Sequence, residues 1–148
     1  MAEKKVQLTG NQLMQMAAQE QQKLAQINNQ IARFQEFKTE LQAAKDVLTE
    51  IANNKKGDKI MINLGAGIYM KATIDETAKA VSSLSGNVFK EKNSKELIKM
   101  LENKIGNMNK TIGKIAEDQQ KAMARVNQLE QVLNAGRQHI QRQKAGQN

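Results

Sequence analysis

Two apolar seams with a heptad repeat flank a central segment of different periodicity, and this arrangement most constrains how the 148-residue chain folds. In both seams, spacings of three and four residues alternate without a break, as at the a and d positions of a coiled coil. The first seam contains Leu13, Ala17, Glu20, Leu24, Ile27, Ile31, Phe34, Lys38, Leu41, Lys45 and Leu48. The second contains Ile98, Leu101, Ile105, Met108, Ile112, Ile115, Gln119, Ala122, Val126, Leu129, Leu133, Gly136 and Ile140.

Both seams carry helix-capping signals at their ends. Thr9 is a suitable N-cap for the first helix, and the stretch from Asn53 to Gly57 is a stop signal. Asn93, followed three residues later by Glu96, is similar to a capping box at the start of the second helix.

These signals predict helices over residues 9–52 and 93–142, and a flexible basic tail over 143–148. Two helices of similar length, each with one apolar side, bury that side most simply by packing antiparallel on each other. A few seam positions are polar, and we interpret them as residues that set the register of the two helices. They are Glu20, Lys38, Lys45 and Gln119.

The segment between the helices, residues 58–92, changes to a period of two, which is typical of strands. The first predicted β-hairpin comprises residues 60–64 and 68–74 around a turn at 65–67, and the second comprises 78–84 and 88–90 around a turn at 85–87. Two short hairpins bury little apolar surface alone and leave their edges open. We therefore predict an obligate oligomer assembled through these strands.

The predicted fold class is α+β and mostly α. It consists of a long antiparallel coiled-coil hairpin with two central β-hairpins through which the chain oligomerises.

Composition excludes most catalytic chemistry. Cysteine is absent and His139 is the one histidine, so disulfides, thiolate metal sites and a histidine-based triad are excluded. The glycines of residues 65–67 lack the spacing of a phosphate-binding loop, and a strand rather than a helix follows them. We expect no enzyme activity, no cofactor and no metal. With no signal-peptide core in the first residues and no apolar run of about 20 residues, we expect a soluble, intracellular protein.

Apolar residues gather near both ends of the chain, which an antiparallel helix pair brings together. They are Leu8, Leu13, Met14, Met16, Val132, Leu133 and Ile140. One interpretation is ordinary packing at the end of a coil. The other is an adaptable apolar surface for many partners, to which flexible Met side chains are suited.

The order helix, two β-hairpins, helix resembles the alpha class of the prefoldin family. Residues 60–72 (IMINLGAGIYMKA) are similar to the central motif of that family, and residues 81–89 (VSSLSGNVF) are similar to its second hairpin, which beta-class subunits lack. The resemblance implies an ATP-independent molecular chaperone (a holdase), located in the cytoplasm. It would assemble as a hexamer of two alpha and four beta subunits, bind unfolded client proteins at the coiled-coil tips, and deliver them to a group II chaperonin.

The resemblance also assigns roles to residues by position. The tip residues that would contact client are the seven end residues given above. The strand residues that would build the oligomeric barrel are Ile60, Ile62, Leu64, Ile68, Met70, Ile74, Val81, Leu84 and Val88. The basic residues that would dock an acidic chaperonin surface are Arg137, Arg142 and Lys144.

Two alternatives remain open. An alpha-like prefoldin that assembles with itself, into homo-oligomers or filaments, would use the same hairpins. The net charge of +8 and the absence of acidic residues after Glu130 are also compatible with a basic coiled-coil protein that binds nucleic acid. Few aromatic side chains are available for base stacking, which argues against nucleic acid. The simplest interpretation of the net positive charge is a helix face that is exposed to solvent.

Overall fold

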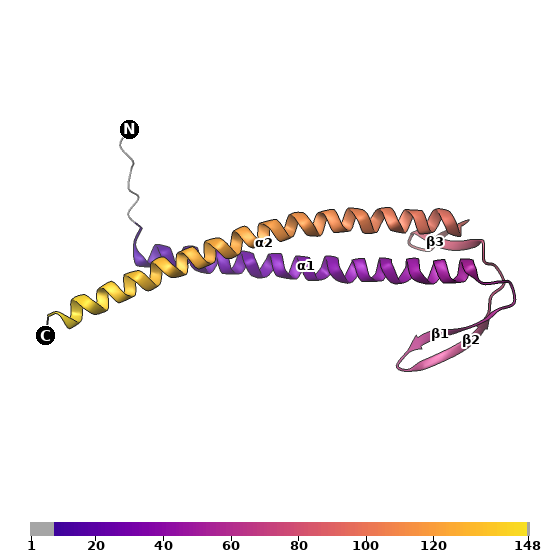
Figure 1. The fold of residues 1–148 in the computed structure, drawn as a ribbon, viewed down its shortest axis with the longest axis horizontal. Helices are drawn as coiled ribbons and strands as arrows, with labels where there is room; N and C mark the ends of the chain where they lie inside the picture. Colours follow the sequence, from indigo (N-terminus) through magenta and orange to yellow (C-terminus); the bar gives the residue numbers. More distant parts are fainter. Residues whose placement is uncertain (1–7, 148) are drawn as a thin grey trace, which may run out of the picture. The chain divides into compact units, whose positions relative to one another are not determined.

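The structure, a computed structural model, describes residues 8–147 and consists of two long helices with four strands between them (Figure 1). The elements are α1 (Gly10–Asn53), β1 (Lys59–Gly65), β2 (Ile68–Thr73), β3 (Lys79–Ser85), β4 (Val88–Asn93) and α2 (Ser94–Ala145). The strands form two antiparallel pairs, β1 with β2 and β3 with β4. The predicted class, mostly helical with two β-hairpins between the helices, is confirmed.

The described chain divides into two compact units, which we treat separately. The helical unit comprises the described residues up to Phe34 together with those from Thr111 onward. The sheet unit comprises Gln35–Lys110 and holds all four strands.

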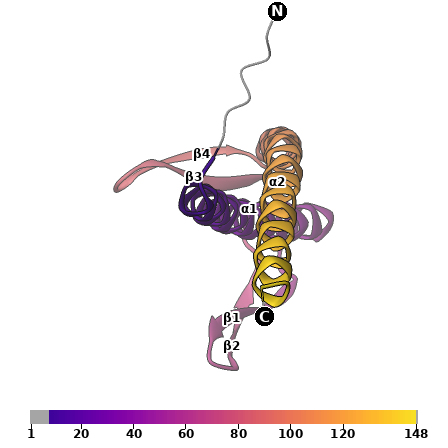
Figure 2. The same ribbon diagram turned by 90° about the vertical axis from the view of Figure 1, so that its left-hand side faces the viewer.

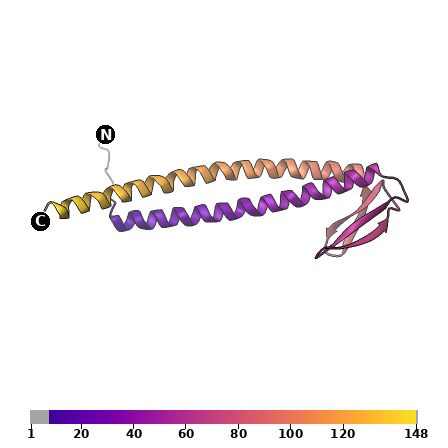
Figure 3. The ribbon, with the colours of Figure 1, turned by 60° about the horizontal axis from the view of Figure 1, so that its bottom comes forward.

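In the helical unit, the two helices lie side by side and antiparallel (Figure 3). Side-chain hydrogen bonds between them define the direction. The amide of Gln21 donates to Glu130 Oε1 at 3.0 Å, and the amide of Gln119 donates to Asn28 Oδ1 at 2.6 Å. The predicted antiparallel packing is therefore present in this unit, and the polar seam residue Gln119 does bond across the helix pair.

The burial pattern follows the heptad seams closely. Every seam position of α1 from Leu13 to Leu48 is buried or half-buried, and so is every seam position of α2 from Ile98 to Leu133. Among the described residues of the helical unit, the buried apolar ones are Ala17, Ile27, Ala122 and Val126. The seam ends earlier than predicted, because Gly136 and Ile140 are exposed.

Thr9 caps the start of α1 as predicted, whereas Asn93 at the start of α2 bonds to the Lys95 amide and not to Glu96, the residue of the predicted capping box. At α1 the bonds are reciprocal, since the Gln12 amide donates to Thr9 Oγ1 at 3.2 Å and the Thr9 amide donates to Gln12 Oε1 at 2.9 Å. At α2, Asn93 Oδ1 accepts a hydrogen bond from the Lys95 amide at 2.8 Å. Such caps satisfy amides that have no partner within the helix.

The end of α2 differs from the prediction. The helix continues to Ala145, so residues 143–145, which we expected in a flexible tail, are helical. Lys and Arg near the helix C-terminus favour this continuation, because their charge complements the negative end of the helix dipole, and Arg142 and Lys144 lie in the last turn.

In the sheet unit, the strand register confirms the predicted alternation of the first hairpin. Ile60 lies opposite Ala72 and Ile62 opposite Met70, so their side chains share one face, whereas Tyr69 and Lys71 lie on the other. In the second hairpin, Val81 lies opposite Glu91, and Ser83 opposite Phe89. Figure 2 shows the two hairpins as separate two-stranded ribbons.

Backbone hydrogen bonds join the base of the first hairpin to the loop after α1, and the base of the second hairpin to the start of α2. Gly57 N donates to Ile74 O, and Ile74 N donates to Asp58 O, both at 2.8 Å. Ser94 closes the second hairpin, where its amide donates to Ala78 O at 2.8 Å. Ile74, Ser94 and Leu97 are all buried, so this junction is the best-covered part of the sheet unit together with Leu41 and Leu101.

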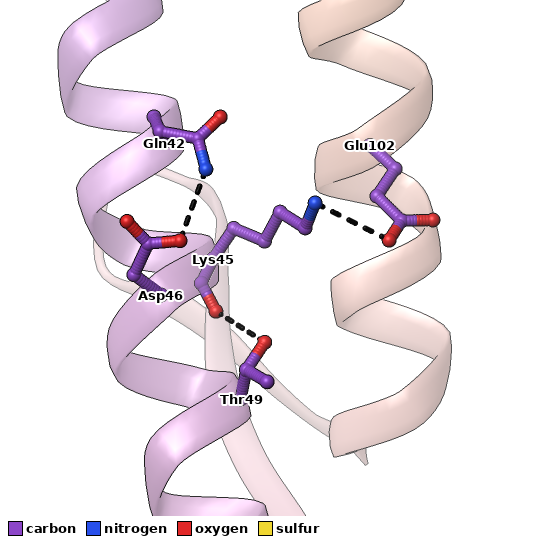
Figure 4. A network of polar contacts seen from close by, with 5 residues as sticks. All are labelled: Gln42, Lys45, Asp46, Thr49 and Glu102. Atoms are coloured by element: carbon purple, nitrogen blue, oxygen red, sulfur yellow. Dashed lines mark hydrogen bonds and ion pairs between the residues drawn. The ribbon is translucent and has the colours of Figure 1, made fainter.

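The polar seam residue Lys45 contacts the opposite helix in the sheet unit (Figure 4). Its ammonium group lies 3.4 Å from Glu102 Oε1, and its backbone carbonyl accepts a hydrogen bond from Thr49 Oγ1 at 2.8 Å. One turn earlier on α1, the Gln42 amide donates to Asp46 at 3.0 Å. The Lys45 side chain is 28% exposed, so its stem is largely covered while the charge reaches a partner.

Candidate functional site

The helical unit exposes most of the apolar side chains that the sequence places near the chain ends. Leu8, Met14, Met16, Val132 and Ile140 are exposed, whereas Leu13 and Leu133 are half-buried at seam positions. The first group is therefore available to a partner, and the second contributes mainly to the contact between the helices.

Two shallow grooves lie beside this apolar set. The first, about 360 Å³ in volume, is lined by Met14, Ala17, Ala18, Gln21, Glu130, Leu133, Asn134 and Arg137. The second, about 340 Å³, is lined by Met16, Gln19, Glu20, Arg125, Gln128 and Leu129. Small alanines at positions 17 and 18 explain why the first groove exists, because short side chains leave space between the helices. Each groove has one methionine in its wall.

The polar groups of the grooves are only partly paired. In the first groove, Gln21 and Glu130 bond to each other at 3.0 Å. In the second, Glu20 Oε1 lies 3.8 Å from the Arg125 guanidinium, and Glu20 Oε2 is buried without a hydrogen-bond partner among the described residues. The wall of the second groove thus contains a carboxylate oxygen that is buried and unpaired.

The C-terminal part of α2 extends past the first residue of α1 (Figure 1). Ile140, near the C-terminal end of α2, is 53% exposed. Of the basic residues considered for docking, Arg137 lines the first groove, and Arg142 and Lys144 are exposed on the last turn of α2. His139 bonds to Gln143 one turn along the helix at 3.1 Å.

Most of the strand residues considered for assembly are exposed. They are Ile62, Leu64, Ile68, Met70, Val81, Leu84 and Val88. Ile60 is half-buried. Ile74 is different, with 6% exposure, since its backbone is tied to the loop after α1 and its side chain lies in the chain's own interior. In this chain Ile74 therefore supports the base of the hairpin from within.

Three large exposed residues of the hairpins were missed by the sequence reasoning. Met61 and Tyr69 lie on the face of the first hairpin that alternation marks as polar, and Phe89 lies on the face of the second hairpin that also carries Val81. The apolar side chains of these residues could have identified them as contact residues. The prediction instead assumed that only one face of each hairpin makes apolar contacts. Both faces of the first hairpin therefore carry exposed apolar side chains.

Among the residues that the structure describes, no group of three acidic or histidine side chains is placed to hold a metal ion. None of the described helices is both long and apolar enough to cross a membrane. The described surface presents exposed apolar side chains and open strand edges.

Comparison with known proteins gives a consistent result. The family model described as "Prefoldin subunit" matches residues 5–139. The prefoldin subunit alpha of Thermofilum pendens is 24% identical over 124 residues, covering 76% of this chain and 96% of that protein. A filamentous PFD from Methanocaldococcus jannaschii, solved by cryo-EM, has a similar fold with a TM-score of 0.62 and 15% identity, covering 80% of this chain and 96% of that one.

A fold of two long helices separated by two exposed β-hairpins, together with a family match over almost the whole chain, defines the class. The chain belongs to the prefoldin family. Within that family it is an alpha-type subunit, as its similarity to the alpha subunit of Thermofilum pendens indicates.

Proposed function

We propose that this chain is a subunit of an ATP-independent chaperone that holds unfolded polypeptides on its helical unit. The observation that carries the proposal is the exposure of Met14, Met16 and Val132 beside two open grooves. The subunit acts by binding alone, without catalysis and without a nucleotide.

The physical basis is the unfavourable free energy of apolar side chains exposed to water, which a bound client reduces by covering them. Covering one large apolar side chain contributes roughly 1.5–3 kcal/mol. Because association itself costs several kcal/mol, one such contact does not hold a client, whereas several on the same helix pair do. Methionine adapts its shape to different partners, which suits clients that share no sequence.

The proposal includes assembly through the hairpins. Exposed apolar strands with unpaired edges need partner strands, and the family match supports other prefoldin subunits as their source. We propose beta-class subunits as partners, in a cytoplasmic hexamer of two alpha and four beta subunits whose hairpins build a β-barrel. Delivery of client to a group II chaperonin, with Arg137, Arg142 and Lys144 at an acidic docking surface, completes this proposal.

A second arrangement has one specific observation in its favour. The fold is similar to that of a filamentous PFD, so assembly of this chain with itself into homo-oligomers or filaments is the alternative to the hexamer. Both arrangements use the same strands, and the chaperone activity proposed for the helical unit is common to both.

The test is suppression of client aggregation by the purified full chain, with and without a beta-class subunit, in the absence of nucleotide. The variant Met14→Gln/Met16→Gln/Val132→Gln keeps helix-favouring side chains and removes the apolar contacts. We expect at least about tenfold more protein to be needed for half-maximal suppression, which corresponds to a loss of about 1.4 kcal/mol.

The matched control is Phe37→Gln/Val47→Gln/Met123→Gln. These side chains are 45%, 54% and 48% exposed on the same two helices, compared with 52%, 40% and 48% for the test residues. We expect the control to act like the unmodified chain. Equal losses in the two variants, or no loss in the first, would overturn the assignment of client binding to this surface.

A further inference from the structure

Methionine thioethers carry all the sulfur of this chain, which has eight methionines and no cysteine. Thioethers are therefore the only sulfur groups in the sequence that a peroxide can oxidise. The methionines of residues 8–147 differ in how far the fold shields them. The exposed ones are Met14, Met16, Met61, Met70 and Met123, and the half-buried ones are Met100 and Met108.

Met14 and Met16 are exposed because neither occupies a seam position of α1. They lie next to the seam residues Leu13 and Ala17, and they are 52% and 40% exposed. Met108, in contrast, occupies a seam position of α2 and is half-buried. Because a peroxide must reach the sulfur atom, exposed thioethers react before shielded ones. Oxidation of Met14 and Met16 therefore leaves the seam residues, which pack the helices together, chemically unchanged.

Both grooves of the helical unit change on oxidation, because each has one methionine in its wall. Met14 lines the first groove together with Leu133, and Met16 lines the second together with Leu129. Oxidation converts a flexible apolar side chain into a polar one. A client that covers a sulfoxide must remove water from its oxygen, which opposes binding unless a hydrogen-bond donor replaces that water. The oxidation state of two sulfur atoms therefore sets the polarity of both grooves.

We propose that Met14 and Met16 are modification sites at which hydrogen peroxide switches client binding off. The inference rests on the proposed client binding by the helical unit and specifies how that binding is regulated. At each site the thioether sulfur forms a bond to one peroxide oxygen while the O–O bond breaks. The sulfur loses two electrons and becomes a sulfoxide, and the peroxide is reduced to water. A methionine sulfoxide reductase, with two electrons from a dithiol, removes the oxygen again as water, so the switch is reversible.

The test compares the full chain before and after treatment with hydrogen peroxide, which is removed before a denatured client is added. Peptide mass spectrometry locates the sulfoxides, and circular dichroism measures the helical content. We expect sulfoxides at Met14 and Met16 before Met100 and Met108. Half-maximal suppression of aggregation should then need at least about fivefold more oxidised than untreated chain, because two apolar contacts become polar. A pair of methionine sulfoxide reductases, one for each sulfoxide epimer, should restore the original value.

The variant Met14→Leu/Met16→Leu removes both sulfur atoms but keeps apolar side chains that favour a helix. Each form is compared with its own untreated sample, so a change in its starting activity does not enter the comparison. We expect peroxide to change the half-maximal concentration of this variant by less than about twofold. The matched control is Met123→Leu, since Met123 is 48% exposed in the same unit but lines neither groove. It should keep the full sensitivity to peroxide.

Sulfoxides at Met14 and Met16 without loss of suppression would overturn the inference while leaving the proposed client binding intact. An equal loss in Met14→Leu/Met16→Leu would also overturn it, because methionines elsewhere in the chain would then be responsible. The same holds for a loss of helical content on oxidation, since the effect would then act through the fold. If the untreated chain does not suppress aggregation, the proposed function fails together with the inference.

Discussion

Ala66 adopts a backbone conformation that its side chain disfavours. Its φ of 52° lies in the left-handed region, and the flanking Gly65 and Gly67 also have positive φ. For a residue with a Cβ atom this conformation costs about 1–2 kcal/mol. Ala66 is exposed, so packing does not offset that cost. Asparagine tolerates the left-handed region better, and Asn-Gly is the preferred pair where both central turn residues have positive φ.

We therefore expect Ala66→Asn to stabilise the β1–β2 hairpin by up to about 1 kcal/mol. Hydrogen exchange of the strand amides should slow by up to about fivefold. Gly67→Ala, at a φ of 77°, should have the opposite effect. Faster exchange in Ala66→Asn would contradict this explanation of the turn.

Glu20 is the seam residue least satisfied by its surroundings. A buried oxygen without a hydrogen-bond partner costs about 1–3 kcal/mol, and Glu20 Oε2 has none among the described residues. Its contact with Arg125 is long, at 3.8 Å, and the Arg125 side chain is 57% exposed. Such a pair contributes little to stability.

We expect Glu20→Leu to raise the free energy of unfolding by about 1–2 kcal/mol, since it places an apolar residue at a seam position. Arg125→Gln should change it by no more than about 0.5 kcal/mol. Denaturant unfolding followed by circular dichroism measures both. A lower unfolding midpoint for Glu20→Leu would show that the carboxylate stabilises the helix pair.

At the scale of the elements, the heptad pattern predicted which face of each helix is buried, because that face depends on periodicity within one helix. It was wrong at Ile140, where the heptad pattern continues but the side chain is 53% exposed. The pattern belongs to one helix, so it does not show where along that helix the contact with the other helix ends. Leu97 is the opposite case: it lies outside the predicted seam, one residue before Ile98, yet it is buried at the hairpin junction with 5% exposure.

The hairpins show a second limit of sequence patterns. Period-two alternation predicted the strands, their turns and the shared face of Ile62 and Met70. It did not distinguish a side chain that meets another chain from one that meets its own, so Ile74 was grouped with the exposed strand residues. Ile74 differs from the exposed strand residues because its backbone is hydrogen-bonded to the loop after α1. These bonds join residues that are distant in sequence.

The ion pair between Lys45 and Glu102 tests how much a polar seam residue contributes to helix pairing. At 3.4 Å, with side chains 28% and 52% exposed, the pair is partly screened by water. In a double-mutant cycle with Lys45→Met and Glu102→Gln, we expect a coupling energy below about 1 kcal/mol that decreases with salt. A coupling energy above about 2 kcal/mol that does not change with salt would instead show that the ion pair is desolvated and fixes the register of the two helices.

At the scale of the whole molecule, the proposed function assigns assembly to the sheet unit and client binding to the helical unit. The sheet unit presents open strand edges with apolar and basic side chains, which suits stable assembly. The helical unit presents scattered methionines and shallow grooves, which suits weak contacts with many partners. This division explains why exposed apolar residues occur both on the strands and on the helices of one chain.

The most direct measurement is site-specific photo-crosslinking of the assembled chain to a chemically denatured client without nucleotide. A photoreactive residue is placed at Met14, Met16 or Val132 in the helical unit, and at Phe37 or Val47 in the sheet unit, where exposure is similar. The account predicts client adducts from the first three positions, and few from the other two. Equal adducts at all five positions, or adducts confined to Phe37 and Val47, would contradict the proposal that the helical unit holds the client.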